Sequence, residues 1–292
     1  MTEIVVLSGK GGTGKTSVTA ALSVLIGKEA VIADCDVDAA NMHLLLEPDF
    51  SESYDFYSGE IARINSELCS QCGRCQQVCR FGAIDFNEDG YKVSELDCEG
   101  CDYCRKVCPE QAIEMLPRKS GILYKSNIRT GTKMVHATMG IGADNSGKLV
   151  ARVKAEAKEI GQKENKSIML VDGSPGTGCP VVSALAGANY ALLVTEPTMS
   201  GLHDLKRVVK VIQRTRMKMG CIINKSDLNP SMTDEIHQFL GEENITLLAD
   251  LHFDTEFNKA MILKKTIVET DSPIKLQIEE AWGKIVETIS KK

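Results

Sequence analysis

Short apolar runs separated by helix-length amphipathic segments form the pattern of hydrophobic and polar positions along most of the chain. Each run is too short for a helix, and several stop at acidic or turn-forming residues, as the run before Asp172 does. Buried strands that alternate with helices indicate a mostly parallel sheet covered on both faces, which is a doubly wound α/β fold. The predicted strands are residues 4–7, 30–33, 168–171, 190–194 and 220–223, and the predicted helices are residues 16–26, 149–162, 201–218 and 232–240.

A cysteine-rich block from residue 59 to residue 117 interrupts this alternation and repeats itself internally. Its first half recurs 29 residues later, and Asp89-Gly90 between the halves indicates a hairpin turn. We therefore expect a small α+β domain, residues 59–118, inserted into a larger domain formed by residues 1–58 and 119–292. Residues 119–148 are glycine-rich and predict no element. The repeated positions are Cys69, Cys72, Cys75, Cys79, Ala83 and Ile84, then Cys98, Cys101, Cys104, Cys108, Ala112 and Ile113.

Composition narrows the class of protein. The chain has 292 residues, a net charge of −6 and 43% hydrophobic residues, so one large or two modest globular domains are expected. The acidic balance argues against a general nucleic-acid binder, which needs a basic surface. No apolar stretch approaches the roughly 20 residues of a spanning helix, and no secretory signal is recognisable. We expect a cytoplasmic protein, in which disulfides are uncommon and 11 cysteines need another role.

A glycine-rich loop follows the first predicted strand and opens the first predicted helix. Residues 9–16 have the P-loop pattern, two glycines flanking four residues and then Lys and Thr. The glycines let backbone N–H groups turn toward phosphate oxygens, and the helix start adds its positive dipole end. Lys15 is expected at the β- and γ-phosphates, and the Thr16 hydroxyl at Mg²⁺. The expected nucleotide-binding residues here are Gly11, Gly12, Thr13, Gly14, Lys15, Thr16 and Ser17.

Lys10 adds a second lysine to this loop. The sequence KGGTGKT resembles the deviant Walker A motif of the MinD, ParA, Mrp and nitrogenase-iron-protein class, P-loop ATPases of the SIMIBI type. The resemblance covers nearly the whole chain outside the cysteine-rich block. It implies a dimer, homomeric or with a related ATPase, in which Lys10 reaches the partner's phosphates. There it would stabilise the negative charge that develops in phosphoryl transfer.

The same resemblance implies roles for residues that follow three other predicted strands. Asp36 would be the switch I aspartate that orients or deprotonates the attacking water, with Asp38 as the alternative. Asp172 resembles the Walker B aspartate that holds Mg²⁺ through a water. Gly176 would lie in switch II, where its backbone N–H can sense the γ-phosphate. Glu196, Pro197 and Thr198, which follow the predicted strand of residues 190–194, are further candidates for lining the nucleotide site.

The residues from Asn224 to Asp227 leave the choice of base open. They equal the NKxD pattern by which GTPases recognise guanine, whereas in the deviant Walker class an asparagine at this place contacts adenine. Asp227 would pair with the N1 and N2 donors of guanine, and adenine has no such donor pair. The loop with Lys10 is the more specific signal, so ATP is favoured and Asp227 would then only cap or solvate the next turn.

The spacing Cys-x₂-Cys-x₂-Cys-x₃-Cys, present twice, is typical of [4Fe–4S] cluster ligands. In two-cluster ferredoxins the fourth cysteine of each motif serves the other cluster. Zinc and a disulfide framework are the competing interpretations, and tandem symmetric quartets favour neither. Pro109 follows Cys108 as the ferredoxin pattern expects, whereas Arg80 takes that place after Cys79. The expected ligands are Cys69, Cys72, Cys75 and Cys108 for one cluster, and Cys98, Cys101, Cys104 and Cys79 for the other.

Together, these motifs resemble MinD-superfamily ATPases with a bacterial-type two-cluster ferredoxin domain inserted between switch I and switch II. The resemblance implies an ATP-hydrolysing dimer whose cycle is coupled to electron transfer, or to assembly of a cluster or metallocofactor, with a redox or metallocofactor partner protein. The alternative is a positioning switch like MinD or ParA, with the ferredoxin module as a redox sensor. The acidic charge weakens a DNA-binding version of that alternative.

Three cysteines and the C-terminal segment lie outside these motifs. Cys179 has the offset from Asp172 of a cluster ligand in the nitrogenase iron protein, but a dimer would supply only two such thiols. A buried or redox-responsive thiol is therefore favoured. Cys35 and Cys221 lie in or beside apolar strands and are expected in the core. Apolar residues at helical spacing over 274–289, diluted by glutamates, favour a core-packing helix over a stable membrane anchor.

Overall fold

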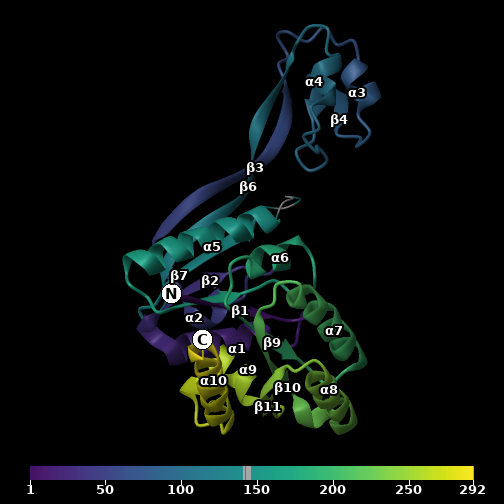
Figure 1. Ribbon diagram of the computed structural model, residues 1–292. Coiled ribbons are helices and arrows are strands. Elements are labelled where there is room, and N and C mark those ends of the chain that lie inside the picture. The colour runs from purple at the N-terminus through teal and green to yellow at the C-terminus, as the bar shows by residue number, and fades with distance from the viewer. Residues whose placement is uncertain (141, 143–145, 292) are drawn as a thin grey trace. The chain divides into compact units, whose positions relative to one another are not determined.

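The computed structural model describes residues 1–140, 142 and 146–291. Nine strands form one sheet in the order β11-β10-β9-β1-β8-β2-β7-β6-β3 (Figure 1). The strands from β11 to β7 in this order pair in parallel, and they include the five predicted apolar runs. Their bounds are β1 Thr2–Leu7, β2 Ala30–Asp34, β3 Glu52–Ile64, β6 Ile113–Asn127, β7 Lys133–Met139, β8 Ile168–Asp172, β9 Tyr190–Thr195, β10 Lys218–Asn224 and β11 Thr246–Leu251.

Helices cover both faces of this sheet (Figure 1). Ile32 of β2 packs in a cluster with Ala20 of α1, whereas a Cβ at Gly161 of α5 would lie 2.9 Å from Cγ1 of Val31. Because successive side chains of a strand point to opposite faces, α1 and α5 lie on opposite sides. The α-helices are α1 Lys15–Ile26, α2 His43–Leu46, α3 Arg74–Val78, α4 Tyr103–Val107, α5 Ser146–Lys163, α6 Cys179–Leu185, α7 Met199–Gln213, α8 Pro230–Glu242, α9 Glu256–Ile262 and α10 Ile274–Ser290. Short 3₁₀ helices span Gly27–Glu29, Ser226–Leu228 and Ile267–Glu269.

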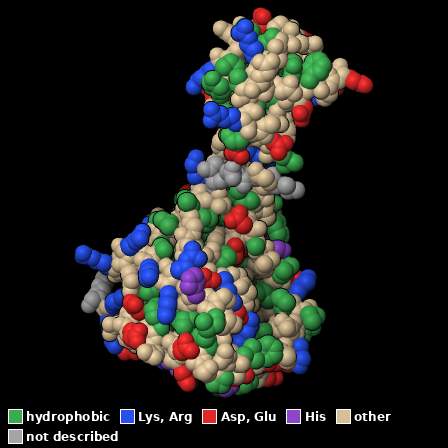
Figure 2. Space-filling model, turned by 90° about the vertical axis from the view of Figure 1, so that its right-hand side faces the viewer, with side chains coloured by type: hydrophobic (Ala, Val, Ile, Leu, Met, Phe, Trp, Pro, Cys, Tyr) green, Lys and Arg blue, Asp and Glu red, His purple; other side chains and the backbone are tan. Residues whose placement is uncertain are grey.

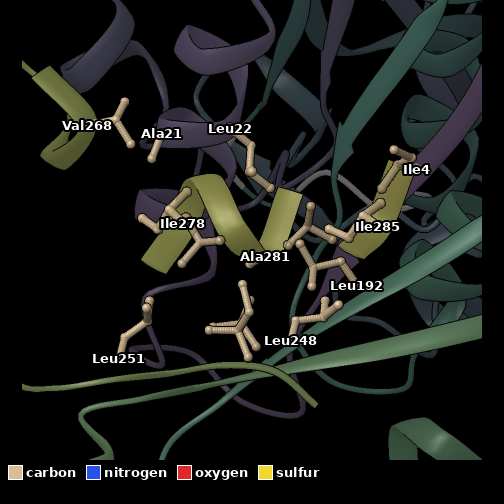
Figure 3. Close-up of a cluster of buried hydrophobic side chains, with 14 of the residues drawn as sticks. Ile4, Ala21, Leu22, Leu192, Leu248, Leu251, Val268, Ile278, Ala281 and Ile285 are labelled. Atoms are coloured by element: carbon tan, nitrogen blue, oxygen red, sulfur yellow. The ribbon is translucent and has the colours of Figure 1, made fainter. Parts of the chain in front are cut away.

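A core cluster joins β1, α1, β9 and the C-terminal helix α10 (Figure 3). Ile278, Ala281 and Ile285 of α10 are fully buried in the same cluster as Ile4 and Leu192. The apolar stripe of the C-terminal segment therefore packs in the core, as predicted. Among the described residues, no helix is both long enough and apolar enough to cross a membrane.

The chain divides into two compact units. The first comprises Met1–Ser53, Leu123–Thr138 and Ser146–Lys292, and the second comprises Tyr54–Ile122 with the described residues of Met139–Asn145. Two boundaries fall inside strands, because β3 and β6 each continue from one unit into the other. The second unit therefore begins earlier and ends later than the 59–118 expected from the cysteine pattern.

The second unit contains the cysteine-rich repeat. Helices α3 and α4 occupy the same place in its two halves, and β4 (Ile84–Asn87) and β5 (Gly90–Val93) form an antiparallel hairpin. This confirms the predicted hairpin, but its two turn residues are Glu88 and Asp89, and Gly90, with a φ of 100°, begins β5 opposite Asn87. The repeat extends to the small core of this unit, which includes Ala83, Ile84, Ala112 and Ile113.

Strands β3, β6, β7 and β11 had no counterpart in the sequence prediction. Most side chains of β3 are exposed, so it lacks the apolar run or strict alternation that indicates a strand. β7 lies in the glycine-rich residues 119–148, where composition gives no periodic signal. These strands form because their backbones pair with neighbours in the sheet, which local sequence does not report.

Removing buried volume from α10 should destabilise the first unit. Ile278→Ala is expected to lower the free energy of unfolding by about 2–4 kcal/mol, because it leaves a cavity in a core where the side chain is 0% exposed. Leu276→Ala on the same helix, where the side chain is 62% exposed, should change it by less than about 0.5 kcal/mol. Urea denaturation of both variants measures this, and equal effects would contradict the packing of α10.

Candidate functional site

The loop between β1 and α1 turns sharply at its glycines. Gly14, directly before α1, has a φ of 92° and Gly12 has a φ of 82°, values that favour glycine. A Cβ at Gly14 would lie 2.3 Å from the side-chain nitrogen of Asn224, so a larger residue does not fit. That nitrogen, Nδ2, donates to the Thr13 carbonyl over 2.8 Å. Asn224, at the end of β10, thus braces the loop.

Lys15, Thr16, Asp36 and Asp172 meet at the carboxyl ends of β1, β2 and β8. The Lys15 Nζ lies 2.9 Å from Asp172 Oδ1 and 3.4 Å from Asp36 Oδ2. The hydroxyls of Thr16 and Thr19 donate to the two Asp172 oxygens over 2.8 and 2.7 Å. The strand order explains this meeting, because β1 and β2 both flank β8 and pair with it in parallel. Residues that follow these strands therefore reach one edge of the sheet.

Burial and mutual charge shift the titration of this cluster. Burial alone would lower the pKa of Lys15, but Asp172 and Asp36 outweigh it and raise that pKa. Burial, aided by the charge of Asp172, raises the pKa of Asp34 to about 7. Asp34 Oδ1 accepts the Asp36 N–H over 3.1 Å, while its Oδ2 is buried and has no hydrogen-bond partner among the described residues. Burial also raises the pKa of Asp36.

A cavity of about 500 Å³ opens beside the loop. Its polar wall is the loop, the first turn of α1 and Asp36, and its apolar wall includes Leu44 of α2, Pro175 and Met261 of α9. The predicted residues that line it are Gly11, Gly12, Gly14, Lys15, Thr16, Ser17 and Asp36. The donors are suited to a magnesium nucleotide, because backbone N–H groups and a lysine attract phosphates, and hydroxyl and carboxylate oxygens suit Mg²⁺.

The other predicted residues lie behind this wall. Asp172 is 0% exposed and reaches the cavity only through its bonds to Lys15 and Thr16. The Gly176 N–H donates to the Ser8 carbonyl over 2.9 Å, which connects the segment after β8 to the loop. Thr13 is part of the loop, and its side chain is buried.

Lys10 points away from this wall. Its Nζ forms an ion pair of 2.7 Å with Glu196, which follows β9. It also donates to Ser200 and Thr198 at the start of α7. Asp38, the alternative to Asp36, is exposed. The structure therefore brings Asp36, and not Asp38, to Lys15.

Three further residues of the site were not predicted from the sequence. Thr19 bonds to Asp172 from the next turn of α1, a place that helical spacing from Thr16 could have indicated. Asp34 ends β2 and pairs in register with Asp172 of β8, which only the strand order reveals. Lys225 donates to the Gly12 carbonyl and to Glu196, whereas its motif suggested a role at the base.

The eight repeated cysteines line two cavities in the second unit. Cys69, Cys72, Cys75 and Cys108 line one. Cys79, Cys98, Cys101 and Cys104 line the other, together with Arg80. Each cavity thus takes three thiols from one motif and the fourth from the other. Within the described part of the chain, no three His, Cys, Asp or Glu side chains meet closely enough to hold a single metal ion.

The surroundings of these cavities differ in their exposure to solvent. Phe81 and Tyr103, which border the cavity of Cys79, are 50% and 54% exposed. Figure 2 shows hydrophobic side chains at the surface of this unit. Tyr91 borders the other cavity and is partly buried, with its ring against Phe86. Burial raises the pKa of Cys104 to about 11, so this thiol keeps its proton at neutral pH.

The remaining cysteines are separate from these cavities. Cys35 and Cys221 are fully buried in the first unit, and burial raises the pKa of each thiol well above its usual value. They are packing residues, as predicted. Cys179 is the first residue of α6 and is exposed, which excludes the buried one of its two expected states and leaves the redox-responsive thiol as a prediction.

Comparison with known families agrees with the geometry of the first unit. Residues 4–267 match the family model described as the CobQ/CobB/MinD/ParA nucleotide binding domain. The chain belongs to this family. It is 30% identical over 293 residues to an uncharacterized protein of Methanocaldococcus jannaschii, covering 98% of this chain and 97% of the relative.

Solved structures of this family share the fold. The cell division ATPase MinD of Pyrococcus furiosus aligns with a TM-score of 0.58 at 19% identity, covering 98% of this chain and 99% of that one. The septum site-determining protein MinD of Pyrococcus horikoshii, solved with Mg-ADP, aligns with a TM-score of 0.57 at 20% identity, covering 100% and 99%. At this identity the likeness establishes the fold alone. The family confirms the predicted α/β P-loop ATPase architecture.

The buried carboxyl of Asp34 should make the nucleotide-free protein less stable as pH rises. Its pKa is raised from 3.8 to about 7, so the folded state holds a proton that the unfolded chain releases over this interval. The free-energy cost of burying the ionised carboxylate is absent below the pKa of Asp34 in the unfolded chain and complete above its pKa in the folded protein. Asp34→Asn should therefore raise the free energy of unfolding by on the order of 2 kcal/mol near pH 8 and barely change it near pH 4.

Urea denaturation at the two pH values measures this difference. Asp38→Asn is the matched control, because Asp38 is exposed and its substitution should change little at either pH. A loss of stability near pH 8 in the Asp34→Asn variant would show that the carboxylate is stabilised rather than penalised.

Proposed function

We propose that this chain binds and hydrolyses ATP with Mg²⁺ and couples that cycle to two [4Fe–4S] clusters. The observation that carries the ATPase part is the meeting of Lys15, Thr16, Asp36 and Asp172 beside a glycine loop and a cavity of about 500 Å³. Phosphoryl transfer needs positioning and charge stabilisation more than covalent chemistry. This cluster supplies both.

Each side chain has a distinct role in the proposed reaction. Lys15 exchanges its carboxylate partners for the β- and γ-phosphates, which neutralises part of their charge. The Thr16 hydroxyl and Asp172, which is bonded to that hydroxyl over 2.8 Å, would hold Mg²⁺. When bound, Mg²⁺ stabilises negative charge on the phosphate oxygens. Asp36 lines the cavity and orients or deprotonates the attacking water. The Gly176 N–H, once released from the Ser8 carbonyl, senses the γ-phosphate.

ATP is favoured over GTP as the nucleotide. One oxygen of Asp227 accepts the Phe253 N–H over 2.5 Å, so this carboxylate is bonded to the segment that follows β11. The side-chain nitrogen of Asn224 is bonded to the loop at Thr13, and Asn224 acts on the nucleotide by holding the loop in shape. The Mg-ADP complex of the MinD relative agrees with an adenine nucleotide.

Lys10 acts across a dimer in this proposal. Its side chain is 26% exposed and lies outside the wall of its own cavity, so it is accessible to a second subunit. The second subunit is another copy of this chain or a related ATPase. A lysine delivered from the partner would complete the charge stabilisation only after both subunits have bound ATP.

The chemistry of the two cysteine cavities supports a ferredoxin-like second unit. Four thiols per cavity, three from one motif and one from the other, is the ligand sharing of two-cluster ferredoxins. Bound clusters would supply one-electron chemistry. The chain itself supplies the thiolates, and Arg80 beside the cavity of Cys79 adds positive charge there. A redox partner, or a client protein that receives a cluster or metallocofactor, completes the proposed function.

Two lysine variants separate binding from dimer-dependent hydrolysis. Lys15→Ala should weaken ATP binding by at least about 100-fold, because it removes the ammonium that would neutralise part of the phosphate charge near Asp36 and Asp172. Lys10→Ala should bind ATP normally and fail to hydrolyse it. Equilibrium binding of a fluorescent ATP analogue and steady-state phosphate release measure these outcomes. Hydrolysis by a monomeric Lys10→Ala chain at the wild-type rate would contradict the role across the dimer.

The shared ligand sets predict the outcome of single cysteine substitutions. The wild type, purified without oxygen, should contain about 8 Fe and 8 sulfide per chain. Cys108→Ser should perturb the same electron paramagnetic resonance signal as Cys69→Ser, and Cys79→Ser the same signal as Cys98→Ser, each with about 4 Fe retained. Cys179→Ser is the control and should keep the full content. Stoichiometric zinc in place of iron would defeat the assignment.

A further inference from the structure

Glu196 lies between two lysines of the nucleotide site. Its Oε1 is 2.7 Å from Lys10 Nζ, and its Oε2 is 2.8 Å from Lys225 Nζ. Lys225 Nζ also donates to the Gly12 carbonyl over 3.2 Å. One carboxylate thus connects Lys10 to the backbone of the phosphate loop. We refer to Lys10, Glu196 and Lys225 as the Glu196 bridge.

Two hydroxyl groups also accept hydrogen bonds from Lys10. Its Nζ donates to Ser200 Oγ over 2.9 Å and to Thr198 Oγ1 over 3.2 Å. The Glu196 side chain is 14% exposed, so solvent and salt screen its ion pairs less than those of a fully exposed carboxylate. Partial burial alone would raise the pKa of Glu196, but Lys10 and Lys225 outweigh it and lower that pKa. The carboxylate is therefore charged at neutral pH.

We propose that Glu196 is a positioning residue that holds Lys10 on its own subunit and thereby opposes nucleotide-dependent dimerisation. This inference rests on the proposed role of Lys10 across the dimer. The Lys10 ammonium has three donors, and in this arrangement they are directed to Glu196, Ser200 and Thr198. The same group cannot reach a partner's phosphates while it keeps these contacts. Breaking the ion pair costs free energy, and this cost makes dimer formation less favourable.

The shared carboxylate also makes the bridge sensitive to the bound nucleotide. Gly12, whose carbonyl accepts from Lys225, lines the cavity proposed for the phosphates. Phosphate charge at the loop attracts both lysines in competition with Glu196, and the attraction grows with the number of negative charges. ATP carries one more phosphate than ADP. It should therefore loosen the bridge more and favour release of Lys10.

The substitution Glu196→Gln tests this role, because it keeps the size of the side chain and removes its charge. With a non-hydrolysable ATP analogue, the dissociation constant of the dimer should fall about 5- to 10-fold relative to the wild type. Sedimentation velocity over a range of protein concentrations measures the constant. Ser200→Ala is the matched control, because it removes a neutral contact of the same ammonium, and the constant should change less than about twofold. Glu196→Met repeats the test if Glu196→Gln folds poorly.

A double variant distinguishes positioning from a general structural effect. Adding Glu196→Gln to a Lys10→Ala chain should leave its association state unchanged, because no ion pair to Lys10 remains. A shift that persists in that chain overturns the proposal. So does an unchanged constant in Glu196→Gln while the wild type dimerises. If both chains stay monomeric with saturating analogue, the dimer of the proposed function fails, and the Glu196 proposal fails with it.

Discussion

The site is organised by one buried ammonium among carboxylates. Lys15 is 5% exposed and lies 2.9 Å from Asp172 and 3.4 Å from Asp36, with Asp34 beside them. Desolvating a charge is costly unless an opposite charge compensates it, so neither the lysine nor the fully buried Asp172 is stable here without the other. The arrangement also prepares the site for its ligands. Under the proposed function, Lys15 turns to phosphate, and Asp172 and Asp36 are then left to attract a cation.

The sheet order makes this meeting of charges possible. β8 lies between β1 and β2, and the register places Asp34 directly beside Asp172. The Cys35 N–H donates to the Asp172 carbonyl over 2.8 Å, which fixes the chain that leads to Asp36. Ligands of open α/β sheets bind at this carboxyl edge. The apolar strands therefore act on the site through their register, although none of their own side chains touches the cavity.

The phosphate loop and the cysteine quartets could be predicted from the sequence, because each is a local pattern whose residue types and spacing are required by the ligand that it binds. The left-handed conformation before the first helix requires a glycine, which is Gly14, and the eight thiols recur at a fixed spacing. Both features can therefore be recognised directly in the sequence. The burial of Asp34 leaves no such trace, because it depends on which strand pairs with β2. Strands β3 and β6 were missed for a related reason, since they are held by neighbouring backbones and expose many side chains. Local sequence patterns therefore predict the chemical groups of a site well, but they do not predict which strands pair with one another.

Both lysines of the loop are held by carboxylates of the same chain, Lys15 by Asp172 and Asp36 and Lys10 by Glu196. The two ion pairs differ in burial, because Lys15 is 5% exposed and Lys10 is 26% exposed. Under the proposed cycle, a polyphosphate bound in the chain's own cavity contacts Lys15 directly, whereas it attracts Lys10 only from a distance and Lys10 contacts phosphate only in a second subunit. The more exposed pair is weaker and more easily broken. Nucleotide binding therefore engages Lys15 and loosens the ion pair of Lys10, and Lys10 binds phosphate only when the dimer forms.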